Sequence, residues 1–304
     1  MKHIIPAIAV LFCLATAANA DPCKLILETR VDMHSDGHGH AAIPVQLNGE
    51  NFDFIVDTGG AATSLSSATA DKLGLPRHPQ NHSAQVAFGG AVVTQYVTAE
   101  HLLIGTLNAY KFNFAVLPNG VLKGIDGLIA PDILAANDVD FDFGNGKFSI
   151  FSQSHCYGGV VYWTKTGFAQ VPFRFDEAHH IALDVSVDGK PTYAALDTGA
   201  PQSIMSLEYA ERTFGIEPNS PDLKLVPLDR TGGRHFYHYP FKALSFNGVV
   251  ISDPDIFLIP DAESDTLGGG DRPKMLVGLS VLGRLHLYIA YGEHNLYVTG
   301  ADAH

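Results

Sequence analysis

Charged residues are scarce in this chain of 304 residues, and basic residues are the scarcer kind. Charged side chains make up 17% of the sequence, and 19 Lys and Arg stand against 32 Asp and Glu, for a formal net charge of −13. Lys and Arg nowhere form a cluster, so the electrostatic footprint of a nucleic-acid-binding protein is missing. Disorder is excluded too, because hydrophobic residues make up 46% of the chain and are spread along it.

Long apolar runs are also missing from most of the chain. The run at residues 4–17 is too short for a comfortable membrane span, and no later stretch reaches 18 apolar residues. A short polar start precedes this run, and the small-x-small site Ala18-Asn19-Ala20 follows it. These are the features of a secretory signal peptide, with a retained membrane anchor as the alternative. We therefore expect residues 1–20 to be removed and the mature protein to be secreted into a bacterial periplasm.

Cysteine is the third scarce residue, with three in the chain. Cys13 lies in the predicted signal peptide, so the mature chain keeps Cys23 and Cys156. In an oxidising compartment only one pairing is available to them. A Cys23–Cys156 disulfide is expected, with two free thiols as the alternative.

Two parts of the chain match each other at a constant offset of 140 residues. Residues 43–66 and 183–206 both show alternating apolar residues, a turn, a second strand and an Asp-Thr-Gly triplet. A short helical stretch follows each, at residues 66–73 and 206–214. The turns are Asn48-Gly49 and Asp188-Gly189, where glycine accepts a positive φ. We therefore predict a duplicated chain of two β-rich lobes, with strands and turns rather than long helices.

An aspartate occupies the same place in both copies. Asp57 follows the apolar strand end Ile55-Val56, and Asp197 follows Ala195-Leu196. If the copies pack about a pseudo-twofold axis, the two carboxylates meet, and carboxylates within about 3 Å of each other share one proton. The charged member can take a proton from water while the protonated member donates to a carbonyl oxygen. This chemistry hydrolyses an amide and requires neither a metal nor a cofactor.

The neighbours of the two aspartates have physical roles of their own. Hydroxyls at Thr58 and Thr198 can bond across the axis and hold the two loops together. Gly59 and Gly199 permit a turn that brings backbone N–H groups near the carboxylates. Four further hydroxyl residues are expected to satisfy backbone groups at the start of the following helices: Thr63, Ser66, Ser203 and Ser206.

These residues carry a family resemblance. Asp57-Thr58-Gly59-Gly60 and Asp197-Thr198-Gly199-Ala200, each followed by a Thr/Ser-x-Leu/Met-Ser pattern, resemble the aspartic peptidases. Over nearly the whole mature chain, the sequence is similar to a bacterial secreted relative with two retropepsin-like lobes in one chain. The resemblance implies a mainly β fold of acid-protease type, with two pseudo-twofold-related β lobes, short helices and a cleft between the lobes.

The resemblance also implies a function. It makes Asp57 and Asp197 the catalytic dyad of an aspartic endopeptidase that hydrolyses a peptide or an unfolded protein, with no cofactor. Because both lobes are in one chain, a monomer is expected. The resulting division is a signal peptide at 1–20, an N-terminal acid-protease lobe at 21–152, an interlobe linker at 153–164 and a C-terminal lobe at 165–304.

Members of this family cover the cleft with a β-hairpin flap, and two glycine pairs fit that role. Gly89-Gly90, next to Phe88, follows Asp57, and Gly232-Gly233 follows Asp197. Paired glycines suit a mobile hairpin tip. We interpret both as flaps, with ordinary surface hairpins as the alternative.

The chain departs from the family pattern at Gly60, where the family usually has Ala, Ser or Thr. A missing hydroxyl removes a possible hydrogen bond to the carboxylate and lets its pKa rise, so we expect activity at mildly acidic pH. Gly60 is also the one feature favouring a weak or inactive protease fold that binds peptides. A metal site at His34, His38 and His40 is disfavoured, since no matching distal Cys or His set is evident.

Overall fold

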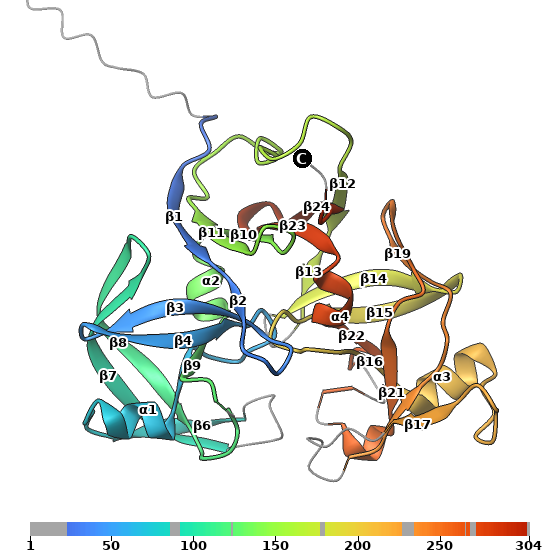
Figure 1. Ribbon diagram of the computed structural model, residues 1–304, viewed down its shortest axis with the longest axis horizontal. Helices are drawn as coiled ribbons and strands as arrows, with labels where there is room; N and C mark the ends of the chain where they lie inside the picture. The colour runs from blue at the N-terminus through green and yellow to red at the C-terminus, as the bar shows by residue number, and fades with distance from the viewer. Residues whose placement is uncertain are drawn as a thin grey trace, which may run out of the picture.

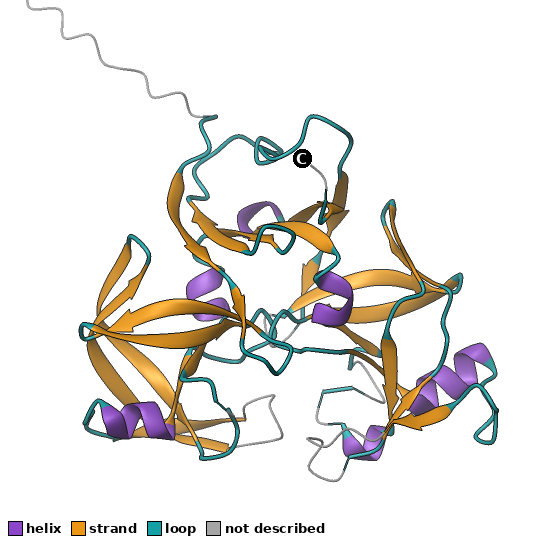
Figure 2. Ribbon diagram, viewed as in Figure 1, coloured by secondary structure: helices purple, strands orange, loops and turns teal. Residues whose placement is uncertain are grey.

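Strands dominate the structure, as the alternation of apolar and polar residues predicts (Figure 2). The computed structural model describes residues 23–85, 92–122, 124–176, 180–226, 234–264, 266–267 and 272–302. The strands form three sheets of eight, ten and six strands. The mainly β, acid-protease-type fold expected from the sequence is therefore confirmed.

The eight-stranded sheet, called the N-terminal sheet, lies on the left in Figure 1. In sheet order its strands are β2 (His34–Ser35), β3 (Ala41–Leu47), β4 (Glu50–Val56), β9 (Gly127–Ile129), β5 (Ser64–Ser66), β8 (Leu107–Leu117), β7 (Val92–Ile104) and β6 (His78–Gln85). An additional pairing of β3 with β7 curls the sheet back on itself.

The ten-stranded sheet, called the C-terminal sheet, lies on the right in Figure 1. Its main path runs through β17 (Lys224–Val226), β18 (Phe236–His238), β21 (Ile256–Ile259), β16 (Ser203–Ser206), β22 (Met275–Val277), β15 (Lys190–Leu196), β14 (Ile181–Val187), β19 (Ala243–Phe246) and β20 (Val249–Ser252). The short strand β13 (Arg174–Phe175) pairs with β14 outside this path.

The six-stranded sheet joins the two halves of the chain and is called the shared sheet. In sheet order its strands are β1 (Leu27–Asp32), β11 (Lys147–Phe151), β10 (Asp138–Asp142), β23 (Leu285–Ala290), β24 (Asn295–Gly300) and β12 (Ala169–Pro172). At its centre β10 pairs antiparallel with β23, a strand from the other end of the sequence. The division at residues 153–164 remains a prediction, and the shared sheet draws strands from both sides of it.

Hairpin turns and helix caps follow the sequence signals. Asn48 and Asp188 begin the turns of the β3–β4 and β14–β15 hairpins with φ of 49° and 45°, and glycine follows each. Ser66 and Ser206 accept the backbone N–H of Thr69 and of Tyr209, so both cap a helix as predicted. The helices are α1 (Ser67–Lys72), α2 (Pro131–Leu134), α3 (Leu207–Phe214) and α4 (Leu279–Leu282), with 3-10 turns η1 (Asp261–Glu263) and η2 (Tyr291–Glu293).

One apolar core runs through all three sheets. Phe54 on β4, Phe141 on β10 and Leu258 on β21 belong to the same buried cluster. The shared sheet also buries polar groups: Asp140 on β10 is fully buried, and His286 on β23 bonds to it at 2.8 Å. The halves are therefore joined by both apolar packing and buried hydrogen bonds.

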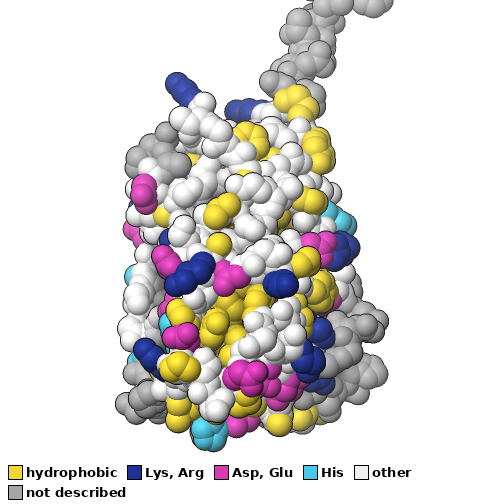
Figure 3. Space-filling view, turned by 90° about the vertical axis from the view of Figure 1, so that its right-hand side faces the viewer, with side chains coloured by type: hydrophobic (Ala, Val, Ile, Leu, Met, Phe, Trp, Pro, Cys, Tyr) yellow, Lys and Arg dark blue, Asp and Glu magenta, His cyan; other side chains and the backbone are white. Residues whose placement is uncertain are grey.

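A disulfide links Cys23 to Cys156 across 133 residues of sequence. It ties the segment before β1 to the predicted linker. None of the helices in the described ranges is long and apolar enough to cross a membrane. On the face drawn in Figure 3, basic and acidic side chains are interspersed around an apolar area, without a large area of one sign.

Candidate active site

The two predicted aspartates hold equivalent places in the N-terminal and C-terminal sheets. Asp57 follows β4, and its N–H donates to Ile129 O on the parallel neighbour β9 at 2.8 Å. Asp197 follows β15, and its N–H donates to Val277 O on the parallel neighbour β22 at 3.0 Å. A buried strand pair thus fixes the backbone of each aspartate.

The two carboxyl groups meet, each lying against the glycine turn that follows the other. A Cβ atom built on Gly59 would lie 2.5 Å from Asp197 Cγ, and one built on Gly199 would lie 2.3 Å from Asp57 Cγ. Real Cβ contacts are not that short, so only glycine leaves room for the opposite carboxyl. A side-chain hydrogen bond joins Asp57 and Asp197.

Hydroxyl groups lock the two turns together beneath the carboxyls. The Oγ1 of Thr58 donates to Leu196 O at 3.1 Å and accepts the N–H of Thr198 at 3.0 Å. In return the Oγ1 of Thr198 donates to Val56 O at 2.6 Å and accepts the N–H of Thr58 at 3.1 Å. Both side chains are buried, so these reciprocal bonds hold the two aspartates in register across the junction.

The electrostatics of the pair favour one shared proton. Burial raises the pKa of Asp57 well above its ordinary range, and the charge of Asp197 raises it further. Burial also raises the pKa of Asp197. The hydrogen bond with Asp57 and those from the N–H groups of Gly199 and Ala200 lower it, but burial outweighs them. The Oδ1 of Asp197 accepts those two N–H groups at 2.8 and 3.1 Å. Both pKa values are therefore raised, and the pair holds one proton between its two carboxyl groups.

The prediction that Thr63 and Ser203 serve the helix starts is wrong. The Oγ1 of Thr63 bonds to Asp132 Oδ1 at 2.5 Å and accepts the N–H of Ala130 at 3.0 Å. The Oγ of Ser203 accepts the N–H of Gly278 at 2.9 Å and bonds to Ser280 at 3.2 Å. Both hydroxyls brace the segment that runs from the parallel neighbour strand into the short helix behind the dyad.

This bracing identifies functional residues that sequence reasoning missed. Asp132 and Ser280 are equivalent, as are Ala130 and Gly278, because Ile129 and Val277 accept the N–H groups of the two aspartates. The signal that could have found Asp132 and Ser280 is their place at the second residue of a short helix, in α2 and in α4.

Gly60 occupies a tight place. A Cβ at residue 60 would lie 3.0 Å from Asp57 Oδ2 and 3.2 Å from Ala130 Cβ. In the C-terminal sheet the sizes are exchanged: Ala200 stands where Gly60 does, and Gly278 stands where Ala130 does. Each side of the dyad thus carries one methyl group at this contact. It belongs to Ala130 on the side of Asp57 and to Ala200 on the side of Asp197.

Several predicted features lie elsewhere or outside the described residues. The flap candidates Phe88, Gly89, Gly90, Gly232 and Gly233 all lie outside the residues that the structure describes. Across the described ranges, no group of three or more His, Cys, Asp or Glu side chains is placed to hold a metal ion. In the loop that contains His34, His38 and His40, His40 Nδ1 bonds to Asp36 Oδ2 at 2.6 Å.

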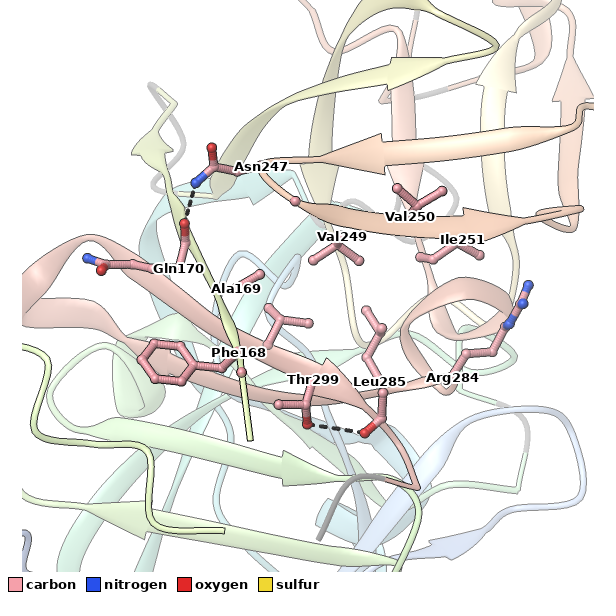
Figure 4. Close-up of a pocket in the computed structure, with 14 residues that line it drawn as sticks. Phe168, Ala169, Gln170, Asn247, Val249, Val250, Ile251, Arg284, Leu285 and Thr299 are labelled. Atoms are coloured by element: carbon pink, nitrogen blue, oxygen red, sulfur yellow. Dashed lines mark hydrogen bonds between the residues drawn. The ribbon is translucent and has the colours of Figure 1, made fainter. Parts of the chain in front are cut away.

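A cavity of about 610 Å³ between β12, β20 and β24 is remote from this chemistry (Figure 4). Its walls mix polar and apolar groups, with Val249, Val250 and Leu285 among the apolar ones, and Arg284 is the one charged side chain in its lining. A single cation without an acid or base nearby does not form a catalytic site.

Comparison with known proteins supports an aspartyl protease-like family. A family model described as aspartyl protease matches residues 43–132, a segment that contains Asp57, its glycine turn and Asp132. No curated protein matches the chain.

Proposed function

We propose that this protein is an aspartic endopeptidase in which Asp57 and Asp197 activate water for attack on a peptide bond. The observation that carries the proposal is the buried, hydrogen-bonded carboxyl pair, with each carboxyl against the opposite glycine turn. Two such groups cannot both ionise, so the pair holds an acid and a base at one point.

The chemistry follows from the position of the proton. The ionised carboxyl of the pair accepts a proton from a water molecule lying between the two groups and the substrate. The protonated carboxyl donates its proton to the carbonyl oxygen under attack, and the water oxygen bonds to the carbonyl carbon. The resulting diol collapses when a proton passes from the dyad to the leaving nitrogen and the C–N bond breaks. No covalent enzyme intermediate forms.

The substrate class and setting belong to the same proposal. An extended peptide or an unfolded protein is the substrate, because the reacting group is a backbone amide. Both carboxyls come from one chain, so a monomer suffices for activity. The predicted signal peptide and the Cys23–Cys156 disulfide suit export to an oxidising compartment, for which we propose a bacterial periplasm.

Cleavage of an unfolded protein tests this function. Residues 21–304 are incubated with casein between pH 3 and 7, and the products are identified by mass spectrometry. We expect cleavage with an optimum at mildly acidic pH, inhibition by a pepstatin-type compound, and no cleavage by the Asp57→Asn/Asp197→Asn double variant. Peptide binding without turnover in a folded sample would contradict the proposal and indicate a peptide-binding module.

A further inference from the structure

A second cavity, of about 490 Å³, adjoins the turn that follows Asp57. Gly60 and Ala61 of that turn belong to its lining, and the N–H of Gly60 donates to Asp57 O at 3.3 Å. The rest of the lining comes from α2, β13, η2 and the predicted linker, so both halves of the chain contribute. Ligand sites in proteins enclose about 300–1,000 Å³, so this cavity can hold a side chain of a peptide bound at the dyad.

Aromatic rings form one wall of this cavity. The rings of Phe175 and Tyr291 are parallel to within 6°, with their centroids 6.3 Å apart. His294 packs edge-to-face against Phe175, with a centroid distance of 5.1 Å. All three residues line the cavity. The faces of aromatic rings attract cations, and a planar guanidinium also stacks on them, so this wall suits a flat cationic group.

Gln153 presents a hydrogen-bond acceptor to the cavity. Its Nε2 donates to Ala135 O at 3.1 Å and to Asn137 O at 3.0 Å. These two bonds direct its Oε1 toward Gly292, where a Cβ atom would lie 3.4 Å from that oxygen. An amide oxygen can only accept, so a ligand beside it has to bring a donor.

Asp132 adds a negative charge at the rim. Its carboxylate accepts the hydroxyl of Thr63 at 2.5 Å and the backbone N–H groups of Thr63 and Ile133, and all of these donors are neutral. Among the described residues that line the cavity there is neither Lys nor Arg to neutralise this charge. A carboxylate beside aromatic faces therefore favours a cation that donates hydrogen bonds.

The hydroxyl of Tyr291 is a buried group that lacks a partner. Tyr291 is 3% exposed, and its hydroxyl has no hydrogen-bond partner in the described part of the chain. Burial raises the pKa of Tyr291, so the hydroxyl stays neutral and its oxygen can accept a hydrogen bond. An unpaired polar atom in the interior costs free energy. Because Tyr291 lines the cavity, a ligand bound there can supply the missing partner.

These groups occur on one side of the dyad. At the offset of 140 residues Ser35 stands where Phe175 does, and Ser280 holds the place of Asp132. The equivalent place beside Asp197 therefore lacks both the ring and the carboxylate. A peptide that crosses the dyad meets this cavity on one side of its scissile bond.

We propose that this cavity binds the guanidinium of an arginine side chain of the substrate, between the aromatic wall and Asp132. The proposal rests on the proposed function and deepens it, because it names a substrate class: peptides with arginine at one fixed distance from the scissile bond. A guanidinium carries five N–H donors in one plane, which match the acceptors of Asp132, Gln153 and Tyr291. A lysine ammonium has three donors and no plane, so it fits less well.

The test titrates residues 21–304 with butylguanidinium and follows the backbone amide signals of Gly60, Ala61 and Gly292 by NMR. Butylurea, which is neutral and nearly the same shape, is the matched ligand control. We expect saturable shifts with butylguanidinium and binding of butylurea that is weaker by about tenfold or more. Tyr291→Phe keeps the ring but removes the hydroxyl, and weakens butylguanidinium about two- to tenfold. Tyr110→Phe, at an exposed tyrosine on β8, leaves the affinity unchanged.

Binding and turnover are read separately, so the two proposals can fail independently. Equal affinity for butylguanidinium and butylurea, or unchanged affinity in folded Tyr291→Phe, would overturn the inference even if casein is cleaved. Binding as expected without hydrolysis refutes only the peptidase function. When casein is cleaved, the aligned cleavage sites should show arginine enriched at one position, and less so with Tyr291→Phe. Cleavage without this preference would overturn the assignment of the cavity to the substrate.

Discussion

At the scale of single residues, the absence of side chains determines how closely the two carboxyls approach. Gly59 and Gly199 leave room for the opposite aspartate, and no other residue would. The sequence was enough to predict Asp57 and Asp197 as candidate site residues, because an ionisable group at the same place in two matched segments has no structural explanation. It could not reveal the contact of Gly60 with Ala130, because 70 residues separate the two and their approach depends on packing.

The exchange of glycine and alanine around the dyad predicts a coupled pair of substitutions. Gly60→Ala places a methyl group 3.0 Å from Asp57 Oδ2, so we expect lower kcat and a lower melting temperature. Adding Ala130→Gly removes the opposing methyl group and restores both, with a coupling free energy of about 0.5–3 kcal/mol between neighbours. Melting curves and initial rates of the two single variants and the double variant measure this coupling. Additive effects would show that the two sites do not sense each other.

At the scale of secondary-structure elements, hydroxyl groups hold the two Asp-Thr-Gly turns in place. Alternating apolar residues and Asn-Gly or Asp-Gly turns predicted the hairpins, and serines at residues 66 and 206 predicted the helix starts. The roles of Thr63 and Ser203 were not predictable from local signals. A serine or threonine before a helix suits a cap, and only the folded chain shows that Asp132 and Ser280 reach these hydroxyls first.

The reciprocal threonine bonds predict a strong effect of an isosteric change. Thr198→Val keeps the shape but removes the hydroxyl, which leaves the N–H of Thr58 and the carbonyl of Val56 buried and unpaired. Each unpaired group costs about 1–3 kcal/mol, so the free energy of unfolding falls and activity falls with it. Urea unfolding of Thr198→Val, Thr58→Val and the double variant checks this. Single losses that sum to the loss in the double variant would contradict a reciprocal network.

At the scale of the whole molecule, the shared sheet joins the first and second halves of the chain. Its central pairing is a long-range contact between β10 and β23, which a local sequence pattern cannot specify. The alternation of aspartates with apolar residues at 138–142 likewise shows which side chains share a face but not what covers that face. In the structure Asp138 and Asp140 are buried beneath the linker and β23.

The buried Asp138–His155 pair predicts that stability falls as the pH rises. Burial lowers the pKa of His155, but its bond to Asp138 at 2.6 Å, its bond to Cys156 O and nearby carboxylates outweigh burial, so the pKa is raised. Burial raises the pKa of Asp138, so the contribution of Asp138 to stability also falls as the pH rises, but over a lower pH range. The His155 contribution is complete below about pH 6.5 and is lost as the pH rises through the raised value.

Trp163, the one tryptophan, stacks on His286 in the shared sheet and reports its unfolding by fluorescence. Between pH 6 and 8 we expect the urea midpoint to decrease in the wild type and to vary less in Asp138→Asn/His155→Gln. His101→Gln, at an exposed site, should follow the wild type. A midpoint that rises over this interval would contradict the assignment.

The disulfide predicts a further contribution to stability. It closes a loop of 133 residues and fastens the start of the shared sheet to the linker. Replacing both cysteines, as Cys23→Ser/Cys156→Ser, is expected to lower the free energy of unfolding by about 2–5 kcal/mol. Denaturant unfolding of the oxidised wild type and the double variant measures the difference. Equal midpoints would mean that the crosslink does not restrict the unfolded chain.

The most direct test of the shared dyad is the activity of each single aspartate variant. Cleavage of casein by Asp57→Asn and by Asp197→Asn is measured beside the wild type at its optimal pH, with folding verified by circular dichroism. Because each carboxyl has a role that the other cannot take over, we predict that each substitution alone lowers kcat/KM by about a thousandfold or more. Cleavage retained by either folded variant would contradict the central claim that the two halves of the chain supply one catalytic pair.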